Sequence, residues 1–196
     1  IWSRWSFVGV GSRGVLTQGA DGVTWIDYGL PASRALGDDC PAAPLEALDH
    51  LYRRWSTPRV EGHPPLTGGL VGFIGWEAVR ELEHLPAAPP ADYAVPGQAF
   101  SFVSELVALD HRTGSAILIA AAVNDGVDDE ETLWADAQRR LDELQTGLAQ
   151  PSEAWLADVD LTVAAEPIPR TRREDFLAAV ERSREYIRDG DVFQVV

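Results

Sequence analysis

FSFVSELVALDHRTGSAILIAAAV, at residues 100–123, is the stretch that decides the fold class. Two runs rich in apolar and β-favouring residues, 100–109 and 115–123, flank the five residues Asp110–Gly114. Strands that are joined by a short loop containing glycine commonly form hairpins. The centre of the chain therefore predicts a pair of antiparallel strands.

Shorter strands are predicted on the amino-terminal side of this hairpin. Trp5–Val10 is rich in β-favouring residues, and Gly11–Gly14 is expected to turn the chain into the next strand at Val15–Thr17. Another glycine-containing turn leads to Val23–Ile26, where alternation places apolar residues on one face. The apolar run Gly68–Trp76 contains several glycines and is also predicted to be a strand.

Three helices are predicted among the first 150 residues. The first begins at Pro44, a residue that suits the first helical position, and carries an apolar stripe at helical spacing. A short helix is expected at 77–85, followed by a proline-rich surface loop at 86–97. The longest spans 129–148 and begins with acidic residues, which the helix dipole favours at that end. Its buried face is expected to carry Leu133, Trp134, Ala137, Leu141, Leu144 and Leu148.

The last quarter of the chain predicts one more helix. Residues 149–170 have no strong periodicity, whereas 171–174, Thr-Arg-Arg-Glu, fit a capping box at a helix start. Gly190 is expected to end this helix in the left-handed conformation, and 191–196 to begin a strand. Its predicted buried face carries Phe176, Val180 and Ile187.

Strands in pairs with helices between them indicate an α+β fold and not a parallel βαβ sheet. The expected organisation is an amino-terminal α+β domain at 1–150, a linker at 151–170 and the start of a second domain at 171–196. Residue 1 is isoleucine, the sequence contains no methionine, and it stops within the β-rich run 193–196. Both ends are therefore expected to be cuts through a longer protein.

Composition excludes several classes of function. The formal charge is −15, from 16 basic and 31 acidic residues, and such a surface repels a polyphosphate backbone, so nucleic-acid binding is not expected. No apolar run reaches the roughly 20 residues that span a bilayer, so no membrane role is expected. Cys40 is the only cysteine, which excludes an intrachain disulfide and fits a cytoplasmic location.

No catalytic constellation is evident in the residues themselves. The glycine-rich segment 68–75 lacks the Gly-Lys-Ser/Thr ending of a nucleotide loop, so its glycines are expected to permit bulges or close strand packing. Cys40 follows two aspartates, which should raise the pKa of its thiol and make it unreactive. The histidines form no metal-binding motif; they are His50, His63, His84 and His111.

Three segments, in order along the chain, resemble the chorismate-utilising enzymes, and among them component I of anthranilate synthase. Ser3–Gly9 is similar to the family's early R-[YW]-S-F-[IL]-G strand. Gly68–Arg80 is similar to G-G-x-x-G-Y-x-x-Y-D-x-x-R, with Trp76-Glu77 in place of the usual Tyr-Asp. Arg173–Val196 resembles the helix and G-D-[IV]-F-Q-V-V passage that precedes the family's catalytic half.

The resemblance implies two antiparallel sheets layered as a sandwich and flanked by helices. It also implies a Mg²⁺-dependent lyase that takes ammonia from a glutamine amidotransferase partner, adds it to chorismate and releases pyruvate. The family's chorismate and Mg²⁺ residues lie beyond Gln194, so no catalytic or metal-binding residue is expected in this chain.

A regulatory site is the one functional site that the resemblance places here. In the family, the feedback inhibitor tryptophan binds near the amino-terminal strand, which is represented by Arg4, Trp5 and Ser6. A guanidinium suits a carboxylate through two parallel hydrogen bonds, and an aromatic ring suits an indole. The alternative is that Trp5 is a core residue and Arg4 an ordinary surface residue.

Two other functions fit the same sequence. The related component I that makes 4-amino-4-deoxychorismate for folate shares the fold and a similar Ser-Arg-aromatic strand. A stand-alone tryptophan-binding regulatory module without chemistry of its own is the second alternative.

Overall fold

The computed structural model describes residues 4–19, 21–91, 94–151, 160–164 and 166–196. The chain divides into two compact units, Ile1–Pro151 and Ser152–Val196. Each unit is described by itself below. The assignment of 171–196 to a catalytic domain remains a prediction.

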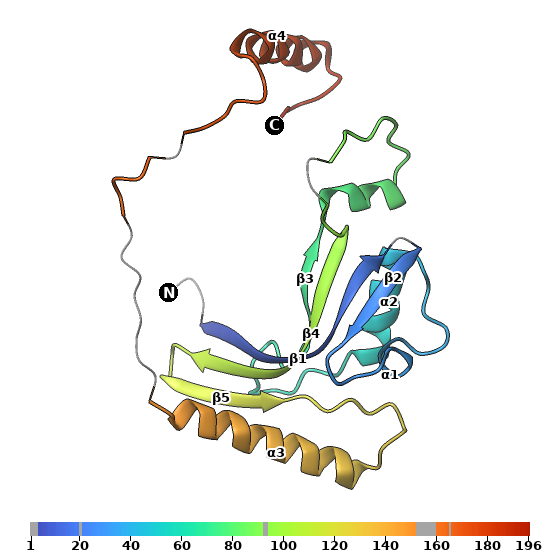
Figure 1. The fold of residues 1–196 in the computed structure, drawn as a ribbon, viewed down its shortest axis with the longest axis vertical. Helices are drawn as coiled ribbons and strands as arrows, with labels where there is room; N and C mark the ends of the chain where they lie inside the picture. The colour runs from blue at the N-terminus through green and yellow to red at the C-terminus, as the bar shows by residue number, and fades with distance from the viewer. Residues whose placement is uncertain (1–3, 20, 92–93, 152–159, 165) are drawn as a thin grey trace. The chain divides into compact units, whose positions relative to one another are not determined.

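One antiparallel sheet of five strands forms the framework of the first unit (Figure 1). Its strands are β1 Trp5–Gly19, β2 Gly22–Asp27, β3 Gly69–Ile74, β4 Gln98–Asp110 and β5 Ser115–Ala120. β1 pairs with β4 over most of its length, while the other edge of β4 is shared between β3 at 98–103 and β5 at 105–110. The predicted hairpin is β4–β5, and the predicted α+β class with antiparallel pairing is confirmed.

β1 is a single long strand, so the predicted turn at Gly11–Gly14 is wrong. The chain accommodates these residues as bulges, because the register with β4 shifts between Gly9 and Val15. At Gly11 an added Cβ would lie 1.7 Å from the Oε2 atom of Glu105, so this side chain passes directly over the glycine. Bulges of this kind bend a strand, and β1 and β4 bend together in Figure 1.

Helices pack around this sheet near the predicted positions. α2 spans Pro44–Trp55, with proline at its first position as predicted, and α3 spans Glu130–Ala149. The short helix after β3 is a 3-10 helix, η1 Trp76–Glu81, and not the longer helix expected at 77–85. The short helix α1, Ala32–Leu36, was not predicted.

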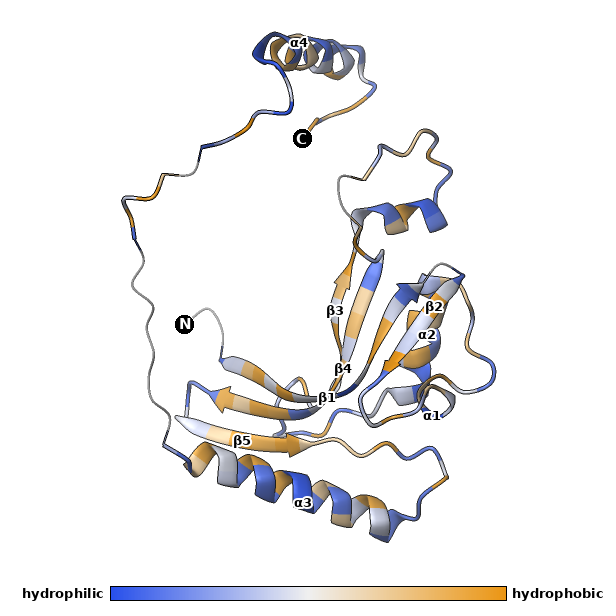
Figure 2. Cartoon of the chain, viewed as in Figure 1, coloured by the Kyte–Doolittle hydropathy of each residue, from blue (hydrophilic) through white to orange (hydrophobic). Residues whose placement is uncertain are grey.

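The buried face of α3 differs from the prediction. Asp129 caps the helix by accepting a hydrogen bond from the Thr132 backbone N–H at 2.7 Å. The buried positions are Ala137, Arg140 and Leu144. Trp134 and Leu148, which were expected on this face, are exposed, since Trp134 lies at the margin of the stripe and Leu148 in the last turn. Figure 2 shows the mixed hydropathy of this helix beside the mainly hydrophobic β5.

The core lies between the sheet and the helices α1 and α2. Its buried residues Leu30, Ala35, Phe102 and Val123 are packed against partly buried neighbours that include two indoles. The Trp25 Nε1–H donates to the Leu30 carbonyl at 2.7 Å and the Trp55 Nε1–H to the Ala35 carbonyl at 3.1 Å. A buried indole normally needs such a partner, so these bonds fix α1 against the sheet and α2.

The second unit contains the helix α4, Arg173–Asp189. The expected capping box is wrong: the cap is Arg172, one residue after Thr171, and it makes no side-chain capping bond. Gly190 adopts the predicted left-handed conformation, at φ 85°. Residues 191–196 form no strand, because a strand needs a paired neighbour.

The apolar face expected on α4 is exposed within this chain. No α4 residue is buried, and the side chains predicted to be covered, Phe176, Val180 and Ile187, are all exposed. Across the described residues, no helix combines the length and apolar character needed to cross a membrane.

Candidate functional site

Arg4, at the start of β1, is held by a buried carboxylate. Its Nε donates to Asp110 Oδ1 at 2.9 Å, and its terminal nitrogen donates to Asp110 Oδ2 at 2.5 Å. The Asp110 side chain is only 4% exposed and also accepts from the Arg112 backbone N–H at 3.0 Å. The bond from Arg4 is the main cause that holds the pKa of Asp110 well below its ordinary range and raises the pKa of Arg4.

Ser6 contacts the same turn between β4 and β5. Its Oγ lies 2.7 Å from Nε2 of His111, and the His111 backbone N–H donates to the Arg4 carbonyl at 2.8 Å. Sequence reasoning assigned His111 to this turn, and the structure confirms it. Arg4 and Ser6 thus fasten the first residues of β1 to a turn that lies more than 100 residues away in the sequence.

Trp5 lies in a different environment from its two neighbours. Its ring stacks on Phe7 with 6.4 Å between centroids, and the Arg4 guanidinium lies 4.7 Å from the ring centroid. Trp5 also lines a cavity of about 1270 Å³. The three predicted effector residues therefore form two groups, with Arg4 and Ser6 at the turn and Trp5 at the cavity.

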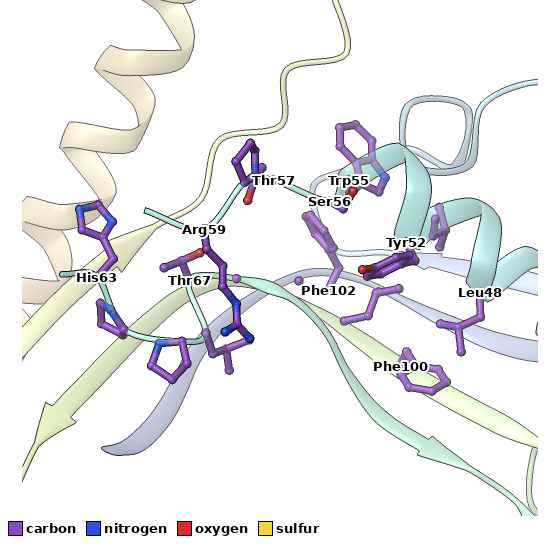
Figure 3. Close-up of a pocket in the computed structure, with 18 of the residues that line it drawn as sticks. Leu48, Tyr52, Trp55, Ser56, Thr57, Arg59, His63, Thr67, Phe100 and Phe102 are labelled. Atoms are coloured by element: carbon purple, nitrogen blue, oxygen red, sulfur yellow. The ribbon is translucent and has the colours of Figure 1, made fainter. Parts of the chain in front are cut away.

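This cavity, called the α2 hollow from here on, lies between α2, the loop 56–68 and the sheet (Figure 3). Its volume is about 1270 Å³, above the range typical of small-molecule sites, so it can admit an amino acid with room to spare. Its apolar wall is formed by Trp5, Leu48, Tyr52, Trp55, Leu70, Phe100 and Phe102. Its polar rim comes from the loop and contains Ser56, Thr57, Arg59, His63 and Thr67.

The sequence did not reveal the α2 hollow, although it predicted the helix that forms one wall. Within the predicted apolar stripe of α2, Leu51 is buried but Tyr52 is 70% exposed. Both residues line the hollow. The signal that could have found it is the loop after the helix, where Arg59 and His63 stand among prolines next to an apolar stripe.

Two residues of the polar rim, Arg59 and His63, have side chains that can carry a positive charge. Within the described ranges of the chain, neither Arg59 nor His63 forms an ion pair. Asp49 of α2 also lines the hollow and pairs with Arg53 at 2.9 Å, with both side chains more than half exposed. Such exposed pairs contribute little to stability, so Asp49 remains available to a ligand.

A second cavity, of about 490 Å³, lies between α3 and the bend of β1. Its charged residues are already paired, since Arg140 binds Glu105 and also donates to Asp136 at 2.9 Å and to the Ala121 carbonyl at 2.9 Å. The Arg140 side chain is almost fully buried. Because every charge here has its partner within the protein, this cavity is structural.

Other candidate groups give no catalytic arrangement. Among the residues that the structure describes, no three His, Cys, Asp or Glu side chains are grouped so as to hold a metal ion. The pKa of the Cys40 thiol is raised, as predicted, although burial contributes more than the neighbouring Asp39. At Gly72 an added Cβ would lie 1.9 Å from the Ala99 carbonyl oxygen, which confirms close strand packing in the glycine-rich segment.

Comparison with known proteins places this arrangement in a family. The sequence model of the chorismate binding enzymes matches residues 20–196. The chain belongs to this family. Similarity extends over the whole chain to the protein named anthranilate synthase component 1 of Arthrobacter globiformis, at 37% identity over 200 residues. The protein of the same name from Mycobacterium tuberculosis strain H37Rv is also similar over the whole chain, at 36% identity over 199 residues.

This chorismate-binding-family chain spans 37% of the length of the Arthrobacter protein and 38% of the Mycobacterium protein. The crystal structure of anthranilate synthase component I from Streptococcus pneumoniae superimposes with a TM-score of 0.69 and 21% identity. The superposition covers 97% of this chain and 40% of the other. At this identity it shows the shared fold, and it confirms the α+β architecture predicted from the sequence.

Proposed function

We propose that this chain is the amino-terminal portion of component I of anthranilate synthase. The observation that carries the proposal is the similarity over the full chain to proteins of that name, at 36–37% identity. The names of these relatives also favour anthranilate over 4-amino-4-deoxychorismate as the product.

The reaction of the complete enzyme, in this proposal, converts chorismate and ammonia to anthranilate and pyruvate. The ammonia comes from glutamine through an amidotransferase partner, and the reaction takes place in the cytoplasm. Mg²⁺ is the proposed cofactor, but the described residues of this chain do not fit it, because they contain no group of three ligands. The segment is therefore assigned no catalytic step.

Its proposed contribution is feedback regulation by tryptophan at the amino-terminal strand. The α2 hollow supports this role, since it combines the aromatic wall that an indole needs with a polar rim. Trp5 belongs to this wall, while Arg4 and Ser6 hold the strand in place through Asp110 and His111. A stand-alone regulatory module shares this binding site but has no connection to turnover.

Exchange of the aligned segment tests the proposal. This chain would replace the matching 200 residues of the Arthrobacter protein, and the product formed from chorismate, Mg²⁺ and ammonium would be identified by chromatography and fluorescence. We expect anthranilate from the exchanged protein and none from this chain alone. A folded exchanged protein that makes 4-amino-4-deoxychorismate, or turnover by the repurified chain itself, would contradict the proposal.

A further inference from the structure

Helix α2 begins without a capping side chain of its own. Its N-cap residue is Ala43, and its first helical residue, Pro44, has no backbone N–H. The Leu45 N–H is therefore the first donor of the helix, and it donates to Oε2 of Glu81 at 3.2 Å. A carboxylate at this end of a helix is favoured by the free N–H groups and by the helix dipole. Glu81 of η1 thus provides the cap that Ala43 cannot provide.

η1 has few other attachments to the rest of its unit. None of its residues is buried, and it lies beyond the end of β3 (Figure 1). The Arg80 side chain bonds to Glu77 and to the Leu85 carbonyl, which belong to the same segment. Within the part of the chain that the structure describes, the hydrogen bond from Leu45 to Glu81 is the only one between η1 and α2.

The sheet holds the elements on both sides of this bond. η1 leaves β3 at Gly75, whose N–H donates to the Gly97 carbonyl at 2.7 Å. The start of α2 is fixed to β4, because Gln98 Nε2 donates to the Pro44 carbonyl at 3.0 Å. Gln98 is 1% exposed, so water does not compete for this second bond. η1 can therefore move about Gly75 while α2 stays on the sheet.

The bond between Glu81 and Leu45, in contrast, is open to water. Glu81 is exposed, so water competes with the Leu45 N–H for its carboxylate. Exposed hydrogen bonds and few buried side chains are typical of segments that open locally while the rest of the domain stays folded. Opening of η1 is therefore expected at a lower free energy than unfolding of the core.

We propose that η1 is a latch on α2, closed by the hydrogen bond between Glu81 and the Leu45 N–H and opened by movement of η1 about Gly75. In the closed state, η1 and the first turn of α2 stabilise each other. In the open state, α2 keeps its bond to Gln98 but loses its cap, and η1 loses its support. Leu45 also lines the α2 hollow, so the latch acts on one wall of that cavity. The latch is a property of the fold and is independent of the proposed function.

Amide hydrogen exchange of the chain, resolved by residue with NMR, tests the latch from the side of η1. Glu81→Ala removes the acceptor, so the Leu45 amide should exchange faster. The Glu83 amide should also exchange faster, because its bond to the Val79 carbonyl, at 2.8 Å, depends on η1 remaining folded. We expect both rates to rise about fivefold, the effect typical of a lost N-cap. The Leu51 amide, in the middle of α2, should exchange as in the wild type.

Ala43→Ser tests the same coupling from the side of α2 and leaves η1 unchanged in sequence. Serine is a preferred N-cap residue, and its hydroxyl would accept from the Leu45 N–H in competition with Glu81. Ala43 is exposed and has the extended backbone of an N-cap, so the hydroxyl fits there. We expect the Glu83 amide to exchange faster in this variant, while the Leu45 amide stays protected.

Glu46→Gln is the matched control for the loss of a negative charge. Glu46 lies in the first turn of α2, and its removal leaves the bond between Glu81 and the Leu45 N–H in place. The Glu83 amide should therefore exchange in this variant as in the wild type. Near-UV circular dichroism should be the same for all three variants.

Three results overturn the latch. If Glu81→Ala leaves Leu45 or Glu83 at its wild-type exchange rate, the bond does not hold both elements together. If Ala43→Ser leaves Glu83 unchanged, the cap of α2 and the folding of η1 are not coupled. If Glu46→Gln accelerates exchange at Glu83 as much as Glu81→Ala does, the loss of negative charge opens η1, and the hydrogen bond has no specific role.

Discussion

The region around α3 and the region around α2 use charge in opposite ways on the same sheet. At α3, Arg140 is almost fully buried and is surrounded by Glu105, Asp136 and a backbone carbonyl. At α2, the cavity is larger, and Arg59 has no ionic partner among the described residues. In the α3 region the charged side chains are paired with one another inside the protein. In the α2 region the Arg59 side chain lines an open cavity.

This difference separates residues that stabilise the protein from residues that can bind a ligand. A buried charge with all its partners is costly to disturb, so the α3 region is expected to resist change. A charge without a protein partner contributes little to stability, so it can be altered without unfolding the chain. The comparison therefore predicts large effects on stability around α3 and effects on binding around α2.

Arg140→Met should give the largest loss of stability. It leaves the Glu105 carboxylate, which lies over Gly11 at the bend of β1, without its cation. Removing one partner of a buried pair typically costs about 3–5 kcal/mol in the free energy of unfolding. Urea denaturation followed by near-UV circular dichroism measures this loss.

The double variant Arg140→Met with Glu105→Gln provides the control for that prediction. Because the second change removes the uncompensated charge, the double variant should be more stable than Arg140→Met alone. If the two unfold at the same urea concentration, the pair does not stabilise the α3 region in the way described.

Leu51→Ala and Tyr52→Ala compare core and cavity at neighbouring positions of α2. Leu51 is 1% exposed, so its truncation should lower the free energy of unfolding by about 2–4 kcal/mol. Tyr52 is 70% exposed, and its truncation should cost less than about 1 kcal/mol. Equal losses in urea denaturation would show that Tyr52 is core and that the hollow is closed in solution.

The Arg4–Asp110 pair predicts a smaller, pH-dependent effect. Arg4 lowers the pKa of Asp110 in the folded state, so the pair stabilises the fold fully above the ordinary aspartate pKa of about 3.9. This contribution is lost as the pH falls below that value toward the lowered pKa. The stability of the wild type should therefore fall more steeply between about pH 5 and pH 2 than that of Asp110→Asn.

Arg4→Gln provides the matched comparison, because it removes the main cause of the shift and leaves the carboxyl group in place. Its acid dependence should resemble that of Asp110→Asn more than that of the wild type. Parallel curves for wild type and Asp110→Asn, measured by urea denaturation across this pH range, would show that the pair does not form in solution.

The sequence predicted elements whose signals are local. The β4–β5 hairpin, the start of α2 at Pro44 and the left-handed Gly190 follow from neighbouring residues, and all three are present. Family membership also followed from three short segments. Local signals failed at the glycines 11–14, because these residues form bulges in the pairing of β1 with β4, a strand that is distant in the sequence.

The candidate site was predicted only in part, for the same reason. Nothing near Arg4 in the sequence indicates that its partner is Asp110, which lies 106 residues further along the chain. Arg59 was not singled out, because its position beside the aromatic wall depends on how the loop 56–68 crosses the sheet. Trp5 and Ser6 face different surroundings because successive side chains of a strand point to opposite faces.

Inhibition of the exchanged protein by L-tryptophan tests the central claim most directly. The Arthrobacter protein that carries this chain in place of its own 200-residue segment would be assayed for ammonia-dependent anthranilate formation over a range of L-tryptophan concentrations. The account predicts that its rate falls as L-tryptophan rises. An exchanged protein whose rate is the same at every L-tryptophan concentration, while the parent protein is inhibited, would contradict the account.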